Sequence, residues 1–594
     1  MRRLRASRIV LGIIAGLSAG LVNAGLLAVL TGPRAMGVLS GAEEPATGLV
    51  IHLILSALSG ITYAWLFNPI PDSDAEGLAS GLAYGLLWWM ILSLNLIPIV
   101  LGEGPQWEVE AVASAFPALV GYLFQGAIVG LGYPILYDIV THWLGPLDEP
   151  VEGPQPLAVQ HKIVILGGGF AGVTVAQHLE RLFAGDESVV MTLISNTNHL
   201  LFTPMLSEVT AGGVEAQHIS TPLRAFFRWT QVIRGEAKAV DFERRVVKLE
   251  VNGPASHAEV SFDHLVLGVG AVTNFFGLPG AEAHAFTFKS LEDANLLRNH
   301  VIEMLERADA EQDSERRKAL VTFVVAGGGF AGAELVGGLN DFVRGSLWFY
   351  PNIPPEEVSL ILVHSGERIM PELSFDLADY AHERLKGRGV AFKLSTRLAN
   401  AVPGAVLLSN GETIRTETLV WTAGNMPHPL IRRMGLDGDA GGAVTTDATL
   451  RVTGRPNVWA IGDCAAVPDS YTGKRCPPTA QHAVRQAATL AHNIHAVIRG
   501  RKTRQFSYRS LGSFAVLGHQ TACAEIRGVK FSGLLAWWLW RAIYLVKLPT
   551  LEKKVRVTLD WTVDLFFPRD IVQTTTSHRS TRGVEALARV DARR

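Results

Sequence analysis

The chain has 594 residues, with 53 lysines and arginines against 55 aspartates and glutamates, and a formal net charge of −2. This even balance excludes the strongly basic composition of a nucleic-acid-binding protein, so no nucleic-acid partner is expected. The three cysteines, Cys464, Cys476 and Cys523, form no CxxC pair, which excludes a disulfide framework and gives no zinc motif, so no metal site is expected.

Four uncharged stretches of 25 to 27 residues occur early in the chain, at 9–33, 45–71, 77–102 and 111–137. About 20 apolar residues suffice for a helix that crosses a bilayer. The stretches predict a four-helix transmembrane module over residues 1–144. A cleaved signal peptide is the competing interpretation of the first stretch, but it is longer than a usual signal core and three similar stretches follow it.

Arginines set the expected orientation of this module in the bilayer. Arg2, Arg3, Arg5 and Arg8 precede the first stretch, and residues 1–150 contain five arginines and no lysine. By the positive-inside rule the N-terminus is cytoplasmic, and four spans return the chain to the cytoplasmic side. We therefore expect a multi-pass protein of the cytoplasmic membrane whose catalytic body lies in the cytoplasm.

Two histidines of the N-terminal region are candidate haem ligands. His52 lies within the second stretch and His142 follows the fourth, so they stand far apart in the sequence. Lone histidines are usually structural, and haem is not expected. The segment 145–160 is rich in proline and reads as a linker to the soluble body.

The string GGGFAG occurs twice, each time after a short apolar run and before a helical pattern. The first copy, in "KIVILGGGFAG", fits GxGxxG with Gly167, Gly169 and Gly172, and places Phe170 and Ala171 among the cofactor-binding candidates. The first glycine permits a tight turn, the second lets the backbone approach a pyrophosphate, and the third lets helix and strand pack closely.

The second copy, in "TFVVAGGGFAG", supplies Gly327, Gly329 and Gly332 in the same context. One such motif is weak evidence, but two strand–GxGxxG–helix units predict two dinucleotide sites, one for a flavin and one for a nicotinamide cofactor. The later run "RPNVWAIGDCA" predicts a strand that returns to the first domain, with Asp463 placed to bind the ribityl chain of the flavin. A plain turn aspartate is the alternative for Asp463.

These segments resemble the type II NADH:quinone oxidoreductases, the non-pumping flavoprotein NADH dehydrogenases, over roughly residues 160 to 570. The resemblance rests on "NHLLFTPMLSEVTAG", "DHLVLGVGAVTNFFGLPG", "LVWTAGNMPHPL" and "CPPTAQHAVRQA". It implies an α/β fold with two dinucleotide-binding domains, bound FAD, NADH as the electron donor and a membrane quinone as the acceptor. Gly270 and Gly424, within these segments, join the cofactor-binding candidates.

The resemblance also implies domain boundaries. It places the FAD-binding domain at 161–318 and 431–500, the NAD(P)H-binding domain at 319–430, and a membrane-anchoring region at 501–594. The last contains "SGLLAWWLWRAIYLVKLP", whose mixture of aromatic, aliphatic and basic residues suits an amphipathic helix in the membrane interface. An ordinary core helix is the alternative. The sequence leaves the oligomeric state open, a homodimer included.

Two residues match the family's catalytic positions. Glu334 matches a glutamate near the nicotinamide and the flavin, although a carboxylate in the first turn of a helix is also favoured by the helix dipole. Gln481 matches a glutamine beside the flavin on the quinone side. No acid–base triad is expected, because the cofactor carries the chemistry.

Three positions depart from the family pattern. Ser195 and His364 stand where acidic residues usually bind the adenosine ribose of FAD and of NADH. A histidine does not repel a 2′-phosphate, so we expect relaxed specificity that admits NADPH. Arg485 stands where a second glutamine is usual, and it either anchors a quinone carbonyl or pairs with a carboxylate.

Two other functions fit parts of the sequence. A sulfide:quinone oxidoreductase shares the fold and needs redox cysteines near the flavin, for which Cys464 and Cys476 are candidates, but the intact second GGGFAG argues against it. A nucleotide-binding redox sensor with a signalling membrane module is the non-enzymatic alternative. A disulfide reductase is disfavoured because no cysteine pair follows the first motif.

Overall fold

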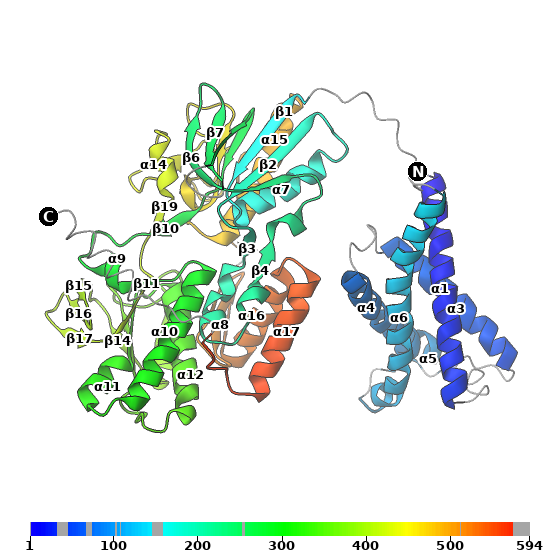
Figure 1. Cartoon of the computed structure of the whole chain (residues 1–594), viewed down its shortest axis with the longest axis horizontal. Coiled ribbons are helices and arrows are strands. Elements are labelled where there is room, and N and C mark those ends of the chain that lie inside the picture. The colour runs from blue at the N-terminus through cyan, green and yellow to red at the C-terminus, as the bar shows by residue number, and fades with distance from the viewer. Residues whose placement is uncertain are drawn as a thin grey trace. The chain divides into compact units, whose positions relative to one another are not determined.

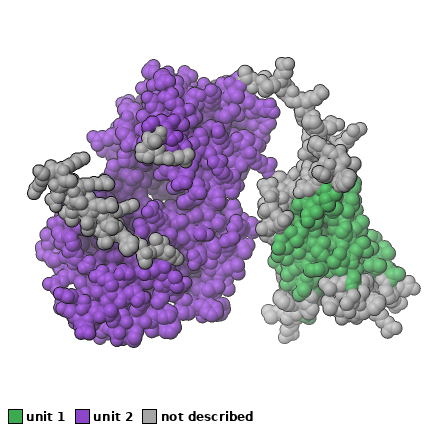
Figure 2. All heavy atoms as spheres, viewed as in Figure 1, with its two compact units in different colours: residues 1–156 green, residues 157–594 purple. Residues whose placement is uncertain are grey.

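The computed structural model divides into two compact units, Met1–Pro156 and Leu157–Arg594, which are coloured separately in Figure 2. Figure 1 traces the elements of each unit. The residues described are 2–31, 45–66, 74–100, 102, 104–106, 109–144, 159–251, 256–510 and 512–573. Residues 145–158 of the expected linker lie outside the described residues.

The first unit is helical, and each of the four uncharged stretches contains a helix. Three segments are long and apolar enough to cross a membrane, Ala46–Leu66, Ser80–Ile99 and Ala118–Leu136, whereas the apolar part of the first helix, Ile9–Gly25, is shorter. A fourth span therefore stays a prediction. The helices are α1 (Arg2–Thr31), α3 (Pro45–Leu66), α4 (Asp74–Ile91), the π-helical turn η1 (Leu92–Leu96), α5 (Ile97–Val100) and α6 (Val109–Leu144).

Glycines bring these helices together in two closely packed pairs. A Cβ on Gly60 of α3 would lie within 3.0 Å of the Gly12 carbonyl oxygen of α1, and a Cβ on Gly81 of α4 would lie equally close to the Gly126 carbonyl oxygen of α6. Such backbone-to-backbone contact between small residues is the usual way in which helices associate in lipid. The α1–α3 and α4–α6 pairs are thus each held by glycine packing.

The second unit contains a five-stranded parallel sheet built around the first glycine motif. Four of the six residues of β1 are buried, as is typical of a parallel strand that is covered on both faces. The helices α7 (Phe170–Leu182) and α15 (Ala480–Ile498) contact each other beside this sheet (Figure 1). In spatial order the strands are β21 (Val458–Ala460), β9 (His264–Leu267), β1 (His161–Leu166), β2 (Val189–Ser195) and β5 (Gln231–Arg234).

A second five-stranded parallel sheet repeats this plan around the second motif. The strand before the glycines, β12, again lies third in the order and is entirely buried. The strands are β11 (Ala285–Thr287), β18 (Thr418–Trp421), β12 (Thr322–Ala326), β13 (Ser359–Val363) and β14 (Val390–Lys393). The helices of this part are α10 (Leu291–Ala310), α11 (Ser314–Leu320), α12 (Phe330–Ser346) and α13 (Phe375–Gly387).

Two strands show how the chain passes between the sheets. The β21 strand returns to the first sheet and pairs with β9, as the "VWAIGD" run predicts. The β11 strand lies inside 161–318, the range expected for the FAD-binding domain, yet it pairs in parallel with β18 of the second sheet. The helix α10 then starts at a capping box in which Ser290 and Asp293 satisfy each other's backbone N–H groups.

Smaller antiparallel sheets complete the second unit. Each parallel sheet has a three-stranded companion, β6–β8 or β15–β17, and β10 with β19 forms a two-stranded connection. The bounds are β3 (His199–Leu201), β4 (Ser220–Pro222), β6 (Glu236–Asp241), β7 (Val246–Glu250), β8 (His257–Ser261), β10 (Ala271–Thr273), β15 (Leu398–Val402), β16 (Ala405–Leu408), β17 (Thr413–Arg415), β19 (Asn425–Pro427), β20 (Val444–Thr445) and β22 (Ala465–Ala466).

The C-terminal part packs a three-stranded sheet and two helices against the core that contains α12. It consists of β23 (Gly512–Val516), β24 (Ala522–Ile526), β25 (Val529–Ser532), α16 (Gly533–Lys547) and α17 (Leu551–Phe566). The remaining short helices are α8 (Leu206–Thr210), α9 (Ala281–His284), α14 (Pro429–Arg433), η2 (Thr203–Met205), η3 (Ala216–Ile219), η4 (Leu223–Phe226), η5 (Leu347–Phe349) and η6 (Gly462–Cys464).

Candidate active site

The first glycine loop connects β1 to α7 at the carboxyl end of the first sheet. Gly167 has a φ of +111°, and a Cβ on Gly172 would lie within 3.0 Å of the Gly167 carbonyl oxygen. Gly169 caps α7 without a side-chain hydrogen bond, and a Cβ on it would meet no atom within 4 Å. The first and third glycines are therefore required by the protein's own packing, while the second borders open space.

The second loop has the same geometry between β12 and α12. Gly327 has a φ of +117°, and a Cβ on Gly332 would again lie within 3.0 Å of the carbonyl oxygen of the first glycine. Gly329 caps α12 without a side-chain partner and borders open space. Each loop thus presents an uncapped helix N-terminus toward a space that the backbone can line, which is the arrangement that a pyrophosphate requires.

The other two motif residues help to join distant segments. The Phe170 ring lies edge-on to Phe202, with ring centroids 5.9 Å apart. Ala171 is buried, and a Cβ on Gly462 would be in ordinary contact with it at 3.4 Å. The returning segment that carries Asp463 therefore packs directly on the first motif helix.

Asp463 follows β21 and lies within η6. The preceding Gly462 has a φ of +72°, and its N–H donates to Gln486 Oε1 at 2.8 Å, which fixes the turn. No described residue donates a hydrogen bond to the Asp463 carboxylate. Burial raises the pKa of this carboxyl, and the charge of Lys289 opposes that rise. A desolvated carboxylate without a protein partner fits a ligand that supplies hydroxyl donors, such as the ribityl chain of FAD.

Lys289 is a residue of this region that the sequence analysis did not single out. Its ammonium donates to the Ala271 carbonyl oxygen at 3.2 Å, and burial lowers its pKa while Asp463 and Asp293 oppose this shift. The only sequence signal is its place just before the α10 capping box, which gives no hint of Asp463 more than 170 positions later in the chain.

Gly270 and Gly424 both adopt left-handed conformations, with φ of +70° and +79°. A Cβ on Gly270 would meet no atom within 4 Å, so this glycine borders open space. A Cβ on Gly424 would instead collide with the Phe276 ring. Close approach of an aromatic ring explains the glycine at 424.

The two ribose-position residues lie at the ends of equivalent strands. Ser195 ends β2, is 4% exposed, and its hydroxyl accepts from the Thr197 N–H at 3.3 Å. His364 follows β13, and its Nδ1 accepts from the Gly328 N–H at 3.1 Å. Because Nδ1 is an acceptor here, the ring is neutral, and burial lowers its pKa further.

Glu334 lies in the second turn of α12, with its carboxylate accepting from the Val516 N–H at 3.2 Å. Burial and the nearby charge of Glu208 raise its pKa to about 8, against the opposing hydrogen bond from Val516. Glu334 as a whole is half-buried, because a narrow cavity borders its side chain. At neutral pH Glu334 is therefore mostly a protonated acid.

Gln481 and Arg485 occupy the first turns of α15, which begins at the N-cap Thr479. Arg485 is exposed and lies over the Tyr508 ring, 5.7 Å from its centroid. It forms no ion pair with a carboxylate in the described chain. Burial and the charge of Arg485 lower the pKa of Lys547 on α16.

An aromatic cluster that the sequence analysis missed lies between these segments. The Tyr544 ring of α16 is 5.9 Å from Phe202, 6.4 Å from Phe514 and 4.8 Å from Trp540, measured between centroids. Phe202 in turn contacts Phe170 of the first motif. A chain of rings thus connects the first glycine loop to the C-terminal helices, and it depends on contacts between segments far apart in the sequence.

The cysteines are not arranged for sulfide chemistry. Cys464 is fully buried, its thiol donates weakly to the Leu267 carbonyl oxygen at 3.5 Å, and burial raises its pKa to about 12. Cys476 is buried too, and burial raises its pKa. The thiolate is the reactive form of cysteine, and both environments disfavour it.

Known proteins share this fold and sequence. The pyridine nucleotide-disulphide oxidoreductase family matches residues 161–487, and the NDH2 C-terminal domain matches residues 510–570. The chain is 30% identical to a probable NADH dehydrogenase of Dictyostelium discoideum, with 69% of this chain and 90% of that protein covered. It is also 30% identical to the type II NADH:quinone oxidoreductase Ndh of Mycobacterium tuberculosis, with coverages of 72% and 92%.

The fold has a solved counterpart in NDH2 from Plasmodium falciparum, with a TM-score of 0.65, 19% identity, and coverage of 70% of this chain and all of that one. Both family matches begin after the first unit, which they leave uncovered. The sequence resemblance is confirmed over the second unit: the chain belongs to the type II NADH:quinone oxidoreductases, the FAD-dependent NADH dehydrogenases known as NDH2.

Proposed function

We propose that the second unit oxidises NADH on its second glycine loop and delivers two electrons, by way of FAD on its first loop, to a quinone at the α15–α16 face, without pumping protons. The observation that carries this assignment is the pair of matching loops, each with a middle glycine that borders open space. FAD, when bound, accepts the hydride of NADH and passes two electrons to the acceptor.

The chain's own residues hold and separate the two nucleotides. The N–H groups of the uncapped α7 terminus bind the pyrophosphate of FAD, and the Asp463 carboxylate accepts from its ribityl hydroxyls. The α12 terminus binds the pyrophosphate of NADH in the same way. Ser195 lies buried beside the first loop, and because its hydroxyl accepts from the Thr197 N–H, its O–H stays available to donate to a ribose oxygen.

The quinone lies, in this proposal, among Gln481, Arg485, Tyr544 and Lys547. Neither Arg485 nor Lys547 pairs with a carboxylate within the described chain. Their positive charges can therefore stabilise a quinone carbonyl or the developing quinol oxygen. Tyr544 and the neighbouring rings supply an apolar wall for the quinone ring. The amide of Gln481 is a hydrogen-bond donor at the other end.

The exposed faces of α16 and α17 explain how this site meets the membrane. Large apolar side chains are exposed along one side of α17, in the first turns of α16 and near the end of α16. They are Leu534, Leu535, Trp538, Val546, Leu551, Val555, Leu559, Val563 and Phe566. Such a surface suits insertion into the membrane interface, where quinones partition. The first unit adds a multi-pass anchor with its N-terminus in the cytoplasm.

Anaerobic mixing tests this function. NADH should bleach the flavin absorbance of the purified full-length protein, and a quinone added afterwards should restore it. Bleaching by sulfide but not by NADH would contradict the assignment and favour a sulfide:quinone oxidoreductase. Nucleotide binding without any bleaching would favour a redox sensor.

Nucleotide preference should change when a carboxylate replaces His364. The neutral imidazole neither repels nor strongly attracts a 2′-phosphate, so the wild type should use NADPH as well as NADH. In His364→Glu, the ratio of kcat/KM for NADH to kcat/KM for NADPH should rise by about tenfold or more. A tenfold change corresponds to about 1.4 kcal/mol of free energy. Steady-state rates with both nucleotides measure it.

His364→Gln is the matched control. Its amide oxygen can accept from Gly328 in place of Nδ1, and it adds no charge, so the preference should stay near that of the wild type. An unchanged preference in His364→Glu would show that residue 364 does not face the 2′ position.

A further inference from the structure

A cluster of charged side chains lies beside Glu334, between α8, α16 and α17. Arg541 is 5% exposed, and its guanidinium carbon is 3.7 Å from the Trp537 ring centroid and 4.7 Å from that of Trp561. Its Nη2 lies 3.9 Å from the Asp564 carboxylate. Glu208 Oε2 accepts from the Trp561 indole N–H at 2.7 Å. Holding three charges in a partly desolvated cluster costs free energy that apolar residues would not, so packing stability alone does not explain the cluster.

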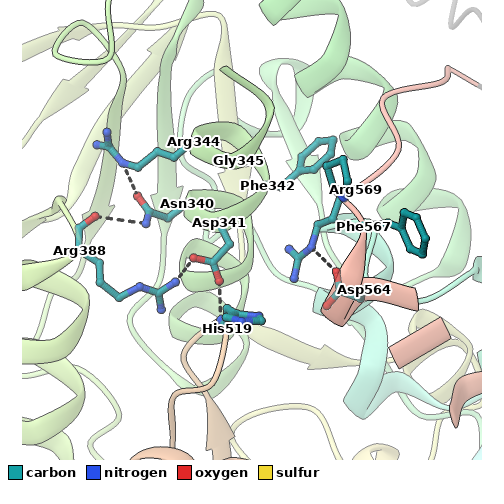
Figure 3. Close-up of a pocket in the computed structure, with 11 residues that line it drawn as sticks. Asn340, Asp341, Phe342, Arg344, Gly345, Arg388, His519, Asp564, Phe567 and Arg569 are labelled. Atoms are coloured by element: carbon teal, nitrogen blue, oxygen red, sulfur yellow. Dashed lines mark hydrogen bonds and ion pairs between the residues drawn. The ribbon is translucent and has the colours of Figure 1, made fainter. Parts of the chain in front are cut away.

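Two adjoining cavities place this cluster between Glu334 and water. The inner cavity, about 20 Å³, has room for a single water molecule and is lined by Glu208, Glu334, Arg541 and Asp564. The outer cavity, about 570 Å³, shares with it His519, Asp564 and Arg569. Figure 3 shows Asp564 and Arg569 on one side of the outer cavity and Asp341 with His519 on the other. Gly345 and Phe567 of its lining are exposed, so this cavity opens at the surface.

The stoichiometry of the reaction needs such a connection. NADH donates a hydride, which carries two electrons and one proton, whereas a quinone takes up two electrons and two protons to become a quinol. The balance is NADH + H⁺ + quinone → NAD⁺ + quinol, so one proton per turnover comes from water. A quinone held at a lipid-facing surface cannot draw that proton from the bilayer.

We propose that Glu208 and Asp564, with Arg541 as a fixed positive charge between them, form a proton inlet from the outer cavity to Glu334. This rests on the proposed function of the second unit. The two carboxylates can each take up and release a proton, and the inner cavity leaves room for a water molecule between them and Glu334. Arg541 supplies a positive charge beside both carboxylates.

The groups that face Glu334 favour this direction of flow. The negative charge of Glu208 and burial together keep Glu334 protonated at neutral pH, ready to donate and be reloaded. Cys523 on β24 and Tyr544 on α16 also face Glu334, and burial raises the pKa of both, so they keep their own protons near neutral pH. His519 lines both cavities, and burial lowers its pKa, which favours the neutral ring. Glu208 and Asp564 are the carboxylates that lie between Glu334 and the outer cavity.

Glu208→Gln tests the inlet in the full-length, FAD-loaded protein. The amide oxygen can still accept from Trp561, so the fold should persist, but the side chain can no longer carry a proton. In anaerobic stopped flow, bleaching by NADH should stay within about twofold of the wild type, since hydride transfer takes up no proton. Reoxidation by a soluble quinone should slow about tenfold or more, with a larger solvent deuterium isotope effect.

Infrared titration supplies a readout apart from turnover. The protonated-carboxyl band that disappears in Glu334→Gln should titrate at a lower pH in Glu208→Gln, because a neighbouring negative charge has been removed. Asp564→Asn, at the outer end of the inlet, should slow reoxidation independently. Glu552→Gln, an exposed carboxylate on the same helix as Asp564, is the matched control and should behave as the wild type.

The outcomes separate the inlet from the proposed function. Wild-type reoxidation rates and isotope effects in both Glu208→Gln and Asp564→Asn would overturn the inlet and leave NADH:quinone oxidoreduction intact. Failure of the wild type to be reoxidised by any quinone would overturn the proposed function itself. Glu208→Asp, which keeps a titratable carboxylate, should recover most of the reoxidation rate.

Discussion

Gly329→Val should raise the KM for NADH by about 10- to 100-fold, one to two steps of 1.4 kcal/mol, while FAD content and melting temperature stay unchanged. The backbone at this position, with φ −74° and ψ −172°, suits any residue, and a Cβ would meet no protein atom within 4 Å. The added side chain therefore obstructs only what enters that space. Gly169→Val, with φ −84°, should in the same way cost FAD and not the fold.

The third glycine of each motif provides the control for the Gly329→Val and Gly169→Val variants. A Cβ on Gly332 or Gly172 would collide with a backbone carbonyl oxygen, so Val at either position should lower the melting temperature and reduce soluble protein. Flavin absorbance per protein, NADH titration and thermal unfolding separate the two classes. Unchanged NADH affinity in Gly329→Val, or full FAD retention in Gly169→Val, would show that the loops do not hold these nucleotides.

The duplicated glycine loops could be predicted because their signal is local. A buried strand, a glycine turn and a helix occupy about twenty consecutive residues, and each glycine answers to a steric demand within them. The returning strand β21 was predictable for the same reason, since "VWAIGD" joins an apolar run to a turn. The residues that determine these elements lie within the elements themselves, and the structure confirms the predicted strands, turns and helices.

Other features depend on contacts between distant segments and left little trace in the sequence. β11 is three residues long and pairs in parallel with β18 of the second sheet. Lys289 reaches Asp463, and Glu208 reaches Trp561, across more than 170 and 350 positions. The aromatic run around Trp537 predicted an interfacial helix, but nothing in it showed that Arg541 points inward between Trp537 and Trp561.

Asp463→Asn should lower FAD affinity by about 10- to 100-fold, because hydrogen bonds to a charged group contribute about 1.5–3 kcal/mol each. The same substitution should raise the melting temperature of the FAD-free protein at pH 7. The folded-state pKa of Asp463 is raised, so folding favours the protonated form, and stability is lost as the pH rises through that pKa. The two proteins should converge in stability as the pH falls toward the ordinary carboxyl pKa of 3.8.

Replacing a ligand-binding carboxylate by asparagine should weaken ligand binding and stabilise the ligand-free protein. Replacing an aspartate that only shapes a turn should not give this pair of opposite effects. Asp447 is the comparison, because its Oδ1 accepts from the Thr449 and Arg451 N–H groups and an asparagine oxygen can replace it. Asp447→Asn should leave FAD affinity unchanged. If Asp463→Asn instead destabilised the FAD-free protein and left FAD affinity unchanged, its carboxylate would be part of the turn and the ribityl contact would have to come from elsewhere.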